Sequence, residues 1–80
     1  MARVTLRLFA GAREAAGTGR DTFDAPSVAV VLEDAVSRFG PEFQKVLDAS
    51  RVWINGDAVE GDQPLTDGDE VAVLPPVSGG

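Results

Sequence analysis

The fold class follows from one segment, residues 27–41, with the sequence Ser-Val-Ala-Val-Val-Leu-Glu-Asp-Ala-Val-Ser-Arg-Phe-Gly-Pro. Ser27 is a favourable N-cap residue, and Gly40 followed by Pro41 is a typical helix stop. Between them, apolar residues recur with the spacing of one helix face: Val28, Val31, Leu32, Ala35, Val36 and Phe39. The segment therefore predicts one amphipathic helix that packs on a core.

The residues before this helix have the patterns of two strands. Residues 4–9 alternate apolar and polar side chains, which is typical of a half-buried strand. Residues 11–17 are too short for an independent helix and predict one helical turn and a loop closed by Gly17 and Gly19. Residues 21–25 suggest a second strand with Phe23 facing inward.

The residues after the helix predict three more strands. Asn55-Gly56 joins residues 52–54 to residues 57–59 and is a strong hairpin signal, because both central residues of a type I′ turn need a positive φ. Residues 70–74 are the last strand pattern. A short second helical segment is suggested by three apolar residues: Phe43, Val46 and Leu47.

This order of elements predicts an α+β fold, a mixed sheet with one main helix packed on one face. The first and last strands are expected side by side and parallel in the centre, which is the β-grasp, or ubiquitin-like, layout. We expect residues 1–74 to form this domain and residues 75–80 to form a flexible Gly-Gly tail. The predicted core contains six residues: Leu6, Leu8, Phe39, Phe43, Ile54 and Val73.

The composition narrows the function classes. Eighty residues make one small domain, and no apolar run approaches the length that crosses a membrane. The chain has no Cys and no His, so a metal or thiol centre is not expected. We expect a cytoplasmic protein. The net charge of −6 disfavours nucleic acid as a partner; it serves solubility alone or steers the chain toward a basic docking surface on a partner protein.

The end of the sequence is the strongest functional signal. Pro75 and Pro76 end the last strand, because proline cannot donate to a sheet ladder. The six residues from Pro75 to Gly80 reach about 20 Å when extended. Gly79 and Gly80 lack a Cβ and suit a narrow passage. Terminal glycines often have no role, but here a carboxylate on a stiffened arm is a plausible reacting group.

Two segments resemble the small subunit of molybdopterin synthase, a sulfur-carrier family: residues 8–17, Leu-Phe-Ala-Gly-Ala-Arg-Glu-Ala-Ala-Gly, and residues 67–80, Asp-Gly-Asp-Glu-Val-Ala-Val-Leu-Pro-Pro-Val-Ser-Gly-Gly. The resemblance covers the whole chain. It implies that an E1-like partner adenylates the Gly80 carboxylate with ATP and that sulfur replaces AMP to give a thiocarboxylate. The chain would then dock on the large synthase subunit, in a heterotetramer, and supply sulfur to cyclic pyranopterin monophosphate. It would bind no cofactor itself.

The resemblance also assigns roles to individual residues. Gly80 would carry the sulfur, and the arm before it would lie in the partner's channel: Pro75, Pro76, Val77, Ser78 and Gly79. Phe9 and Leu74 match the family's apolar docking patch on the sheet, although a core position is the other reading of Phe9. Leu74 stands where some members have an aromatic residue, and Ala58 where a larger apolar residue can occur, so this patch is smaller than theirs.

Three other functions stay open from the sequence. The chain could be a sulfur carrier for another pathway, such as thiamin, cysteine or tRNA thiolation. It could be a ubiquitin-like modifier that joins Gly80 to lysines of target proteins. It could also be a plain interaction domain with an inert tail.

Overall fold

The computed structural model describes residues 2–76, in which strands and helices follow the predicted order. The elements are β1 (Ala2–Leu8), α1 (Ala10–Ala16), β2 (Arg20–Ala25), α2 (Val28–Phe39), α3 (Pro41–Asp48), β3 (Arg51–Ile54), β4 (Asp57–Val59) and β5 (Glu70–Leu74). The expected single main helix is α2, which has 12 residues, but α1 and α3 are full helices rather than single turns. Gly17 ends α1 in the left-handed conformation, as its position predicted.

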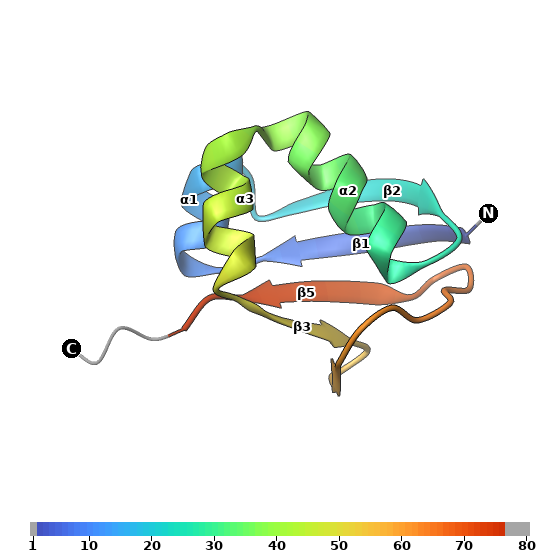
Figure 1. Ribbon diagram of the computed structural model, residues 1–80. Coiled ribbons are helices and arrows are strands. Elements are labelled where there is room, and N and C mark those ends of the chain that lie inside the picture. Colours follow the sequence, from blue (N-terminus) through green and yellow to red (C-terminus); the bar gives the residue numbers. More distant parts are fainter. Residues whose placement is uncertain (1, 77–80) are drawn as a thin grey trace.

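Five strands form one mixed sheet in the order β2-β1-β5-β3-β4. The central pair, β1 and β5, is parallel, and each of the other neighbouring pairs is antiparallel. Figure 1 shows β1 and β5 side by side although they lie at opposite ends of the sequence. This arrangement confirms the predicted β-grasp layout.

The helices pack on one face of the sheet and bury its apolar side chains (Figure 1). Along β1, every second residue from Ala2 to Leu8 is buried, which is the alternation that the sequence predicted. Of the predicted core residues, Leu6, Leu8, Phe43, Ile54 and Val73 are buried. Phe39 is only partly buried and lies at the edge of this core, with its ring in edge-to-face contact with Phe43 and Phe23.

The start of α2 is stabilised by a residue that the sequence did not indicate. The Ser27 side chain makes no capping hydrogen bond, although Ser27 is the N-cap as predicted. The carboxylate of Asp62 instead accepts from the Ala29 N–H at 2.8 Å, and the Gln63 carbonyl accepts from the Val28 N–H at 2.9 Å. The free N–H groups of the first helical turn are thus satisfied by a distant loop.

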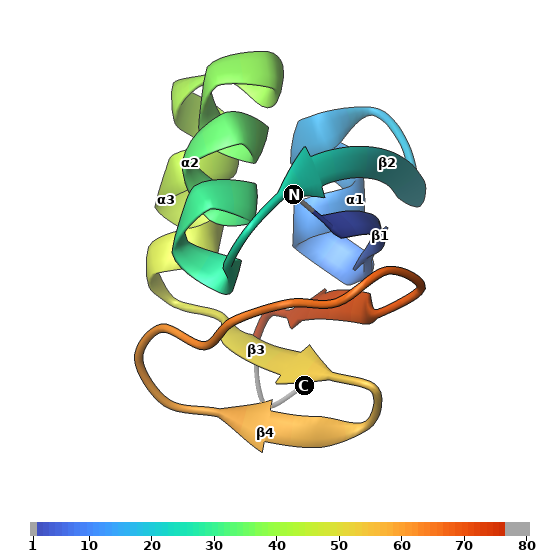
Figure 2. The same ribbon diagram turned by 90° about the vertical axis from the view of Figure 1, so that its right-hand side faces the viewer.

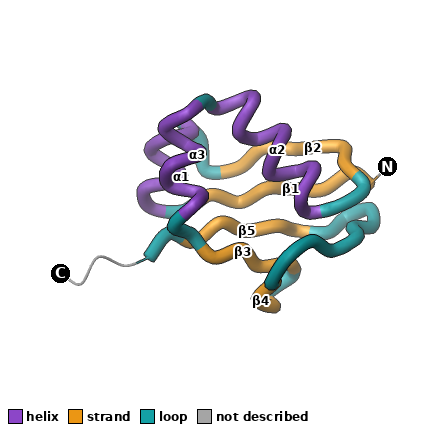
Figure 3. The backbone as a smooth tube through the Cα atoms, in the orientation of Figure 1, coloured by secondary structure: helices purple, strands orange, loops and turns teal. Residues whose placement is uncertain are grey.

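That loop, residues 60–69, joins β4 to β5 along the start of α2, and it is the longest teal segment in Figure 3. The Asp69 carboxylate accepts from the Thr66 N–H at 2.9 Å and from the Asn55 amide at 3.0 Å. Asn55 (φ 49°) and Gly56 (φ 89°) form the predicted hairpin turn, both with positive φ. The side chain of Asp69 therefore links the β3–β4 hairpin to the loop just before β5.

Candidate functional site

The candidate site lies where β1 and β5 end together, on the sheet face opposite α2 and α3, here called the outer face. Phe9 directly follows β1, and Leu74 is the last residue of β5. Leu8 pairs with Val73 in the parallel register, so the next residues along, Phe9 and Leu74, are neighbours. They are 39% and 38% exposed and are the exposed large hydrophobic residues of the described chain. The core alternative for Phe9 is therefore wrong.

Phe9 is held in place by its backbone and by Arg7. Its extended conformation (φ −125°, ψ 153°) continues β1, and Ala10 then turns the chain into α1 with a φ of 48°. The Arg7 guanidinium lies 5.6 Å from the centre of the Phe9 ring. Residues 7 and 9 share one face of an extended chain, so this contact places Phe9 on the outer face with Arg7.

The apolar surface continues from Leu74 across the sheet. Ala72 of β5 is paired with Trp53 of β3, and Trp53 is paired with Ala58 of β4. Trp53 is half-buried, and because Ile54 beside it is in the core, its indole belongs to the outer face. The outer patch, defined as Phe9, Leu74, Ala72 and Trp53, therefore extends from the ends of the central strands toward the β3–β4 hairpin. Figure 2 shows this hairpin at the edge of the sheet away from β2.

The predicted arm begins at this patch. Pro75 is partly buried, and Pro76 is exposed. Both follow Leu74 outside any strand, as expected for residues that cannot continue the ladder. The remaining predicted site residues, Val77, Ser78, Gly79 and Gly80, lie outside the described residues. Their roles, like the partner-binding roles of Phe9 and Leu74, remain predictions.

Basic side chains surround the patch, a feature that the sequence analysis missed. Arg7 forms an ion pair with Glu70 at 3.5 Å on the outer face. Arg20 is paired with Arg7 in the strand register, and Arg51 is paired with Leu74. No local sequence pattern joins these arginines, because each lies on a different strand.

The ionisable groups with shifted pKa values serve the fold rather than this site. A hydrogen bond from Arg38 lowers the pKa of Asp21 below its ordinary 3.8. The Ala29 N–H lowers the pKa of Asp62, and the Thr66 N–H lowers that of Asp69. All three carboxylates accept hydrogen bonds that join segments far apart in the chain or close a turn. They are poor candidates for proton transfer, since each is held in its charged form.

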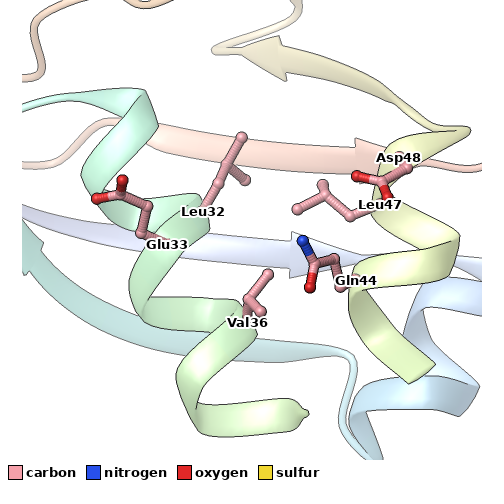
Figure 4. A pocket seen from close by; sticks show the side chains of 6 residues that line it. All are labelled: Leu32, Glu33, Val36, Gln44, Leu47 and Asp48. Atoms are coloured by element: carbon pink, nitrogen blue, oxygen red, sulfur yellow. The ribbon is translucent and has the colours of Figure 1, made fainter. Parts of the chain in front are cut away.

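A separate hollow of about 290 Å³ lies between α2 and α3, on the other side of the sheet. Leu32, Val36 and Leu47 line it, with Glu33, Gln44 and Asp48 at its margins (Figure 4). It contacts neither Phe9 nor Leu74 and is no part of the candidate site. Within residues 2–76, acidic side chains form no cluster suited to a metal ion, and no helix is long and apolar enough to cross a membrane.

The mixed sheet and its helices define the class as ubiquitin-like β-grasp proteins. The chain belongs to the ThiS family, whose sequence profile matches residues 6–80. Small archaeal modifier protein 1 from Methanosarcina acetivorans is 34% identical, with a TM-score of 0.87, and the match covers 100% of this chain and 98% of that one. No curated protein matches the sequence.

Two molybdopterin-related structures are also similar. A Pyrococcus furiosus protein bearing the name molybdopterin converting factor subunit 1 is 28% identical, with a TM-score of 0.83 and 96% and 100% of the two chains covered. A chain in the complex of molybdopterin-converting factor subunits 1 and 2 from Helicobacter pylori is 23% identical, with a TM-score of 0.73 over 98% and 99% of the chains. The second likeness concerns the fold alone. The family match and the similarities to small archaeal modifier protein 1 and to the Pyrococcus furiosus protein place the chain among ubiquitin-like sulfur carriers and modifiers.

Proposed function

We propose that this chain is the sulfur-carrier subunit of a molybdopterin synthase and delivers sulfur from a thiocarboxylate on Gly80. The observation that carries the proposal is the exposed pair Phe9 and Leu74 beside Pro75, at the root of the arm. A large exposed apolar patch usually marks a binding surface. Here the patch would hold the partner while the arm enters the partner's active site. The similarity to a protein named molybdopterin converting factor subunit 1 supports this choice of pathway.

The proposed chemistry starts with activation of the carboxylate. An oxygen of the Gly80 carboxylate attacks the α-phosphate of ATP on an E1-like partner, and pyrophosphate leaves. A sulfide equivalent then attacks the acyl carbon, AMP leaves, and the thiocarboxylate remains. A free carboxylate is a poor acyl donor, whereas the mixed anhydride with AMP has a good leaving group. This chain binds neither ATP nor a metal in this scheme.

The second stage is delivery of the sulfur. The chain docks on the large subunit, and the thiocarboxylate sulfur attacks a side-chain carbon of the cyclic pyranopterin substrate, from which an oxygen substituent leaves. A second activated chain supplies the second sulfur of the dithiolene in the same way. Hydrolysis of the resulting thioester leaves sulfur on the pterin and restores the Gly80 carboxylate. Docking makes the encounter intramolecular, which lowers the entropy cost of the attack. In this scheme the partner supplies the acid and base groups, and this subunit is a sulfur donor rather than the catalyst.

Reconstitution with the activating enzyme, the large subunit and cyclic pyranopterin monophosphate tests this function. The intact mass of the activated chain should rise by the exchange of one oxygen for one sulfur, and the pterin should become a dithiolene. Deleting Gly80, or adding one residue after it, should abolish transfer without changing the unfolding temperature. A variant with one residue added before Met1 is the matched control and should transfer normally. Full transfer by a chain with an amidated Gly80 would refute the proposal.

A second candidate, a protein modifier, is favoured by the 34% identity to small archaeal modifier protein 1. In this function the activated Gly80 carboxyl forms an amide with a lysine of a target protein. Because no Lys or Arg follows Arg51, trypsin would leave a long branch, residues 52–80, on the target lysine. A protease that cuts after glutamate would leave residues 71–80 instead. Detection of both branched peptides on lysines of cellular proteins would identify a modifier, provided that they disappear when Gly80 is deleted.

A further inference from the structure

The residues around the outer patch carry the opposite charge from the molecule as a whole. The net charge is −6, from thirteen acidic and seven basic residues. Yet four of the seven basic residues surround the patch: Arg7, Arg13, Arg20 and Arg51. They come from β1, α1, β2 and β3, and the fold brings them together.

Strand register and a surface hollow fix these positions. Arg51 is directly opposite Leu74 across the β3–β5 pair. Arg7 and Arg20 are directly opposite each other across the β1–β2 pair. A hollow of about 400 Å³ lies beside Phe9, and its other lining residues are Arg7, Arg13, Arg20, Leu8, Thr18 and Gly19. The apolar side chains of the patch are therefore flanked by guanidinium groups on both sides.

Few acidic groups offset these cations. Glu70 pairs with Arg7, and Glu14 lies next to Arg13 on α1 at the margin of the surface. Within residues 2–76, Arg13, Arg20 and Arg51 form no ion pair. By contrast, acidic residues outnumber basic ones on α2 and α3, on the opposite side of the sheet. These helices expose four carboxylates, Glu33, Asp34, Glu42 and Asp48, and two cations, Arg38 and Lys45.

We propose that the outer patch docks on a partner protein whose surface places carboxylates around an apolar depression. This inference rests on the proposed function, in which the patch binds the large synthase subunit. It reverses what the net charge suggests, since an acidic protein would be steered toward a basic surface. Close to the interface the local arginines determine the sign of the electrostatic potential, because a Debye length of about 8 Å screens the acidic far side. The depression accepts Phe9 and Leu74, and the carboxylates pair with Arg20 and Arg51 at the margins.

Two other occupants fit this surface less well. A second copy would place the same arginines against each other in an isologous contact, which repels. Nucleic acid would contact the arginines but would also meet an acidic molecule, and the patch offers only a short row of cations to its phosphates. A partner protein with acidic margins complements both the apolar outer patch and the arginines around it.

Charge reversal at the margins tests the proposal. Arg51→Glu and Arg20→Glu, both exposed, are compared with Lys45→Glu, an exposed cation on α3 that gives the same change in net charge. Binding to the cognate large subunit is measured by stopped flow and calorimetry at low and high salt. Each arginine variant should bind about tenfold more weakly at low salt, mainly through slower association, and the loss should shrink at high salt. Lys45→Glu should bind like the unmodified chain.

The outcomes separate this inference from the proposed function. If the unmodified chain does not bind the large subunit, the proposed function fails. If it binds but all three variants bind equally well, the function stands and the acidic docking surface is refuted. Restored binding of Arg51→Glu to a large subunit with one interface carboxylate changed to arginine would establish the pairing. Two results would overturn the inference: tight binding of a single-stranded RNA 20-mer, or dimerisation measured by sedimentation. In either case the arginine variants must change the result and Lys45→Glu must leave it unchanged. Unchanged thermal melts show that the variants remain folded.

Discussion

Truncation of Phe9 to alanine should weaken docking on the large subunit by about 30-fold. Phe9 is 39% exposed, which is about 80 Å² if a phenylalanine residue presents about 200 Å² in all. Burying that area in an interface at about 25 cal/mol/Å² contributes about 2 kcal/mol. Since 1.4 kcal/mol is a factor of ten, the dissociation constant should rise about 30-fold.

The same substitution also lowers stability, and the experiment must separate the two effects. The covered part of the residue, about 120 Å², contributes at most about 3 kcal/mol to the free energy of unfolding. Phe39→Ala is the matched control, because Phe39 is a half-buried phenylalanine packed on the opposite face against Phe43. It should lose a comparable amount of stability but bind the large subunit normally.

Calorimetric titration of the large subunit, well below the unfolding temperature of each variant, measures the effect on folded protein. Circular dichroism at the same temperature gives the folded fraction. Binding of Phe9→Ala within twofold of the unmodified chain would refute the docking role of Phe9. Equal weakening by Phe39→Ala, with both variants folded, would show that the loss is not specific to the outer patch.

Three further predictions concern the fold that presents the patch. Phe43→Ala should lower the free energy of unfolding by about 3–5 kcal/mol, because the ring is fully buried, whereas Phe43→Leu should cost far less in the same denaturant titration. Asp62→Ala should lower the melting temperature more than Ser27→Ala does, because the Asp62 carboxylate, and not the Ser27 side chain, holds the first turn of α2; an equal effect would contradict this assignment. The lowered pKa values of Asp21, Asp62 and Asp69 predict stability that is fully present above about pH 4 and is lost as the pH falls through their folded-state values. In urea titrations from pH 7 to pH 2, Asp21→Asn should reduce that loss, and an unchanged profile would exclude the Asp21–Arg38 pair as a contributor.

Local sequence patterns were sufficient to predict most of the elements. The apolar spacing of residues 28–39 and the alternation along residues 4–9 reflect which side chains a helix or a strand can bury on one face. The Asn55-Gly56 turn is equally local, since only two residues must adopt a positive φ. The lengths of α1 and α3 were underestimated, because packing on the core stabilises short helices that are marginal in isolation.

What the sequence by itself determined is the set of elements, their β-grasp order and the expectation that Phe9 and Leu74 face outward next to the arm. Only the tertiary structure decided what surrounds them. Arg7, Arg20 and Arg51 meet at the patch because strand register joins segments up to about 65 residues apart in the chain. The same holds for Asp62, which reaches the start of α2 from a distant loop. Contacts of this kind depend on how completed elements pair, and no periodicity within one element can encode them.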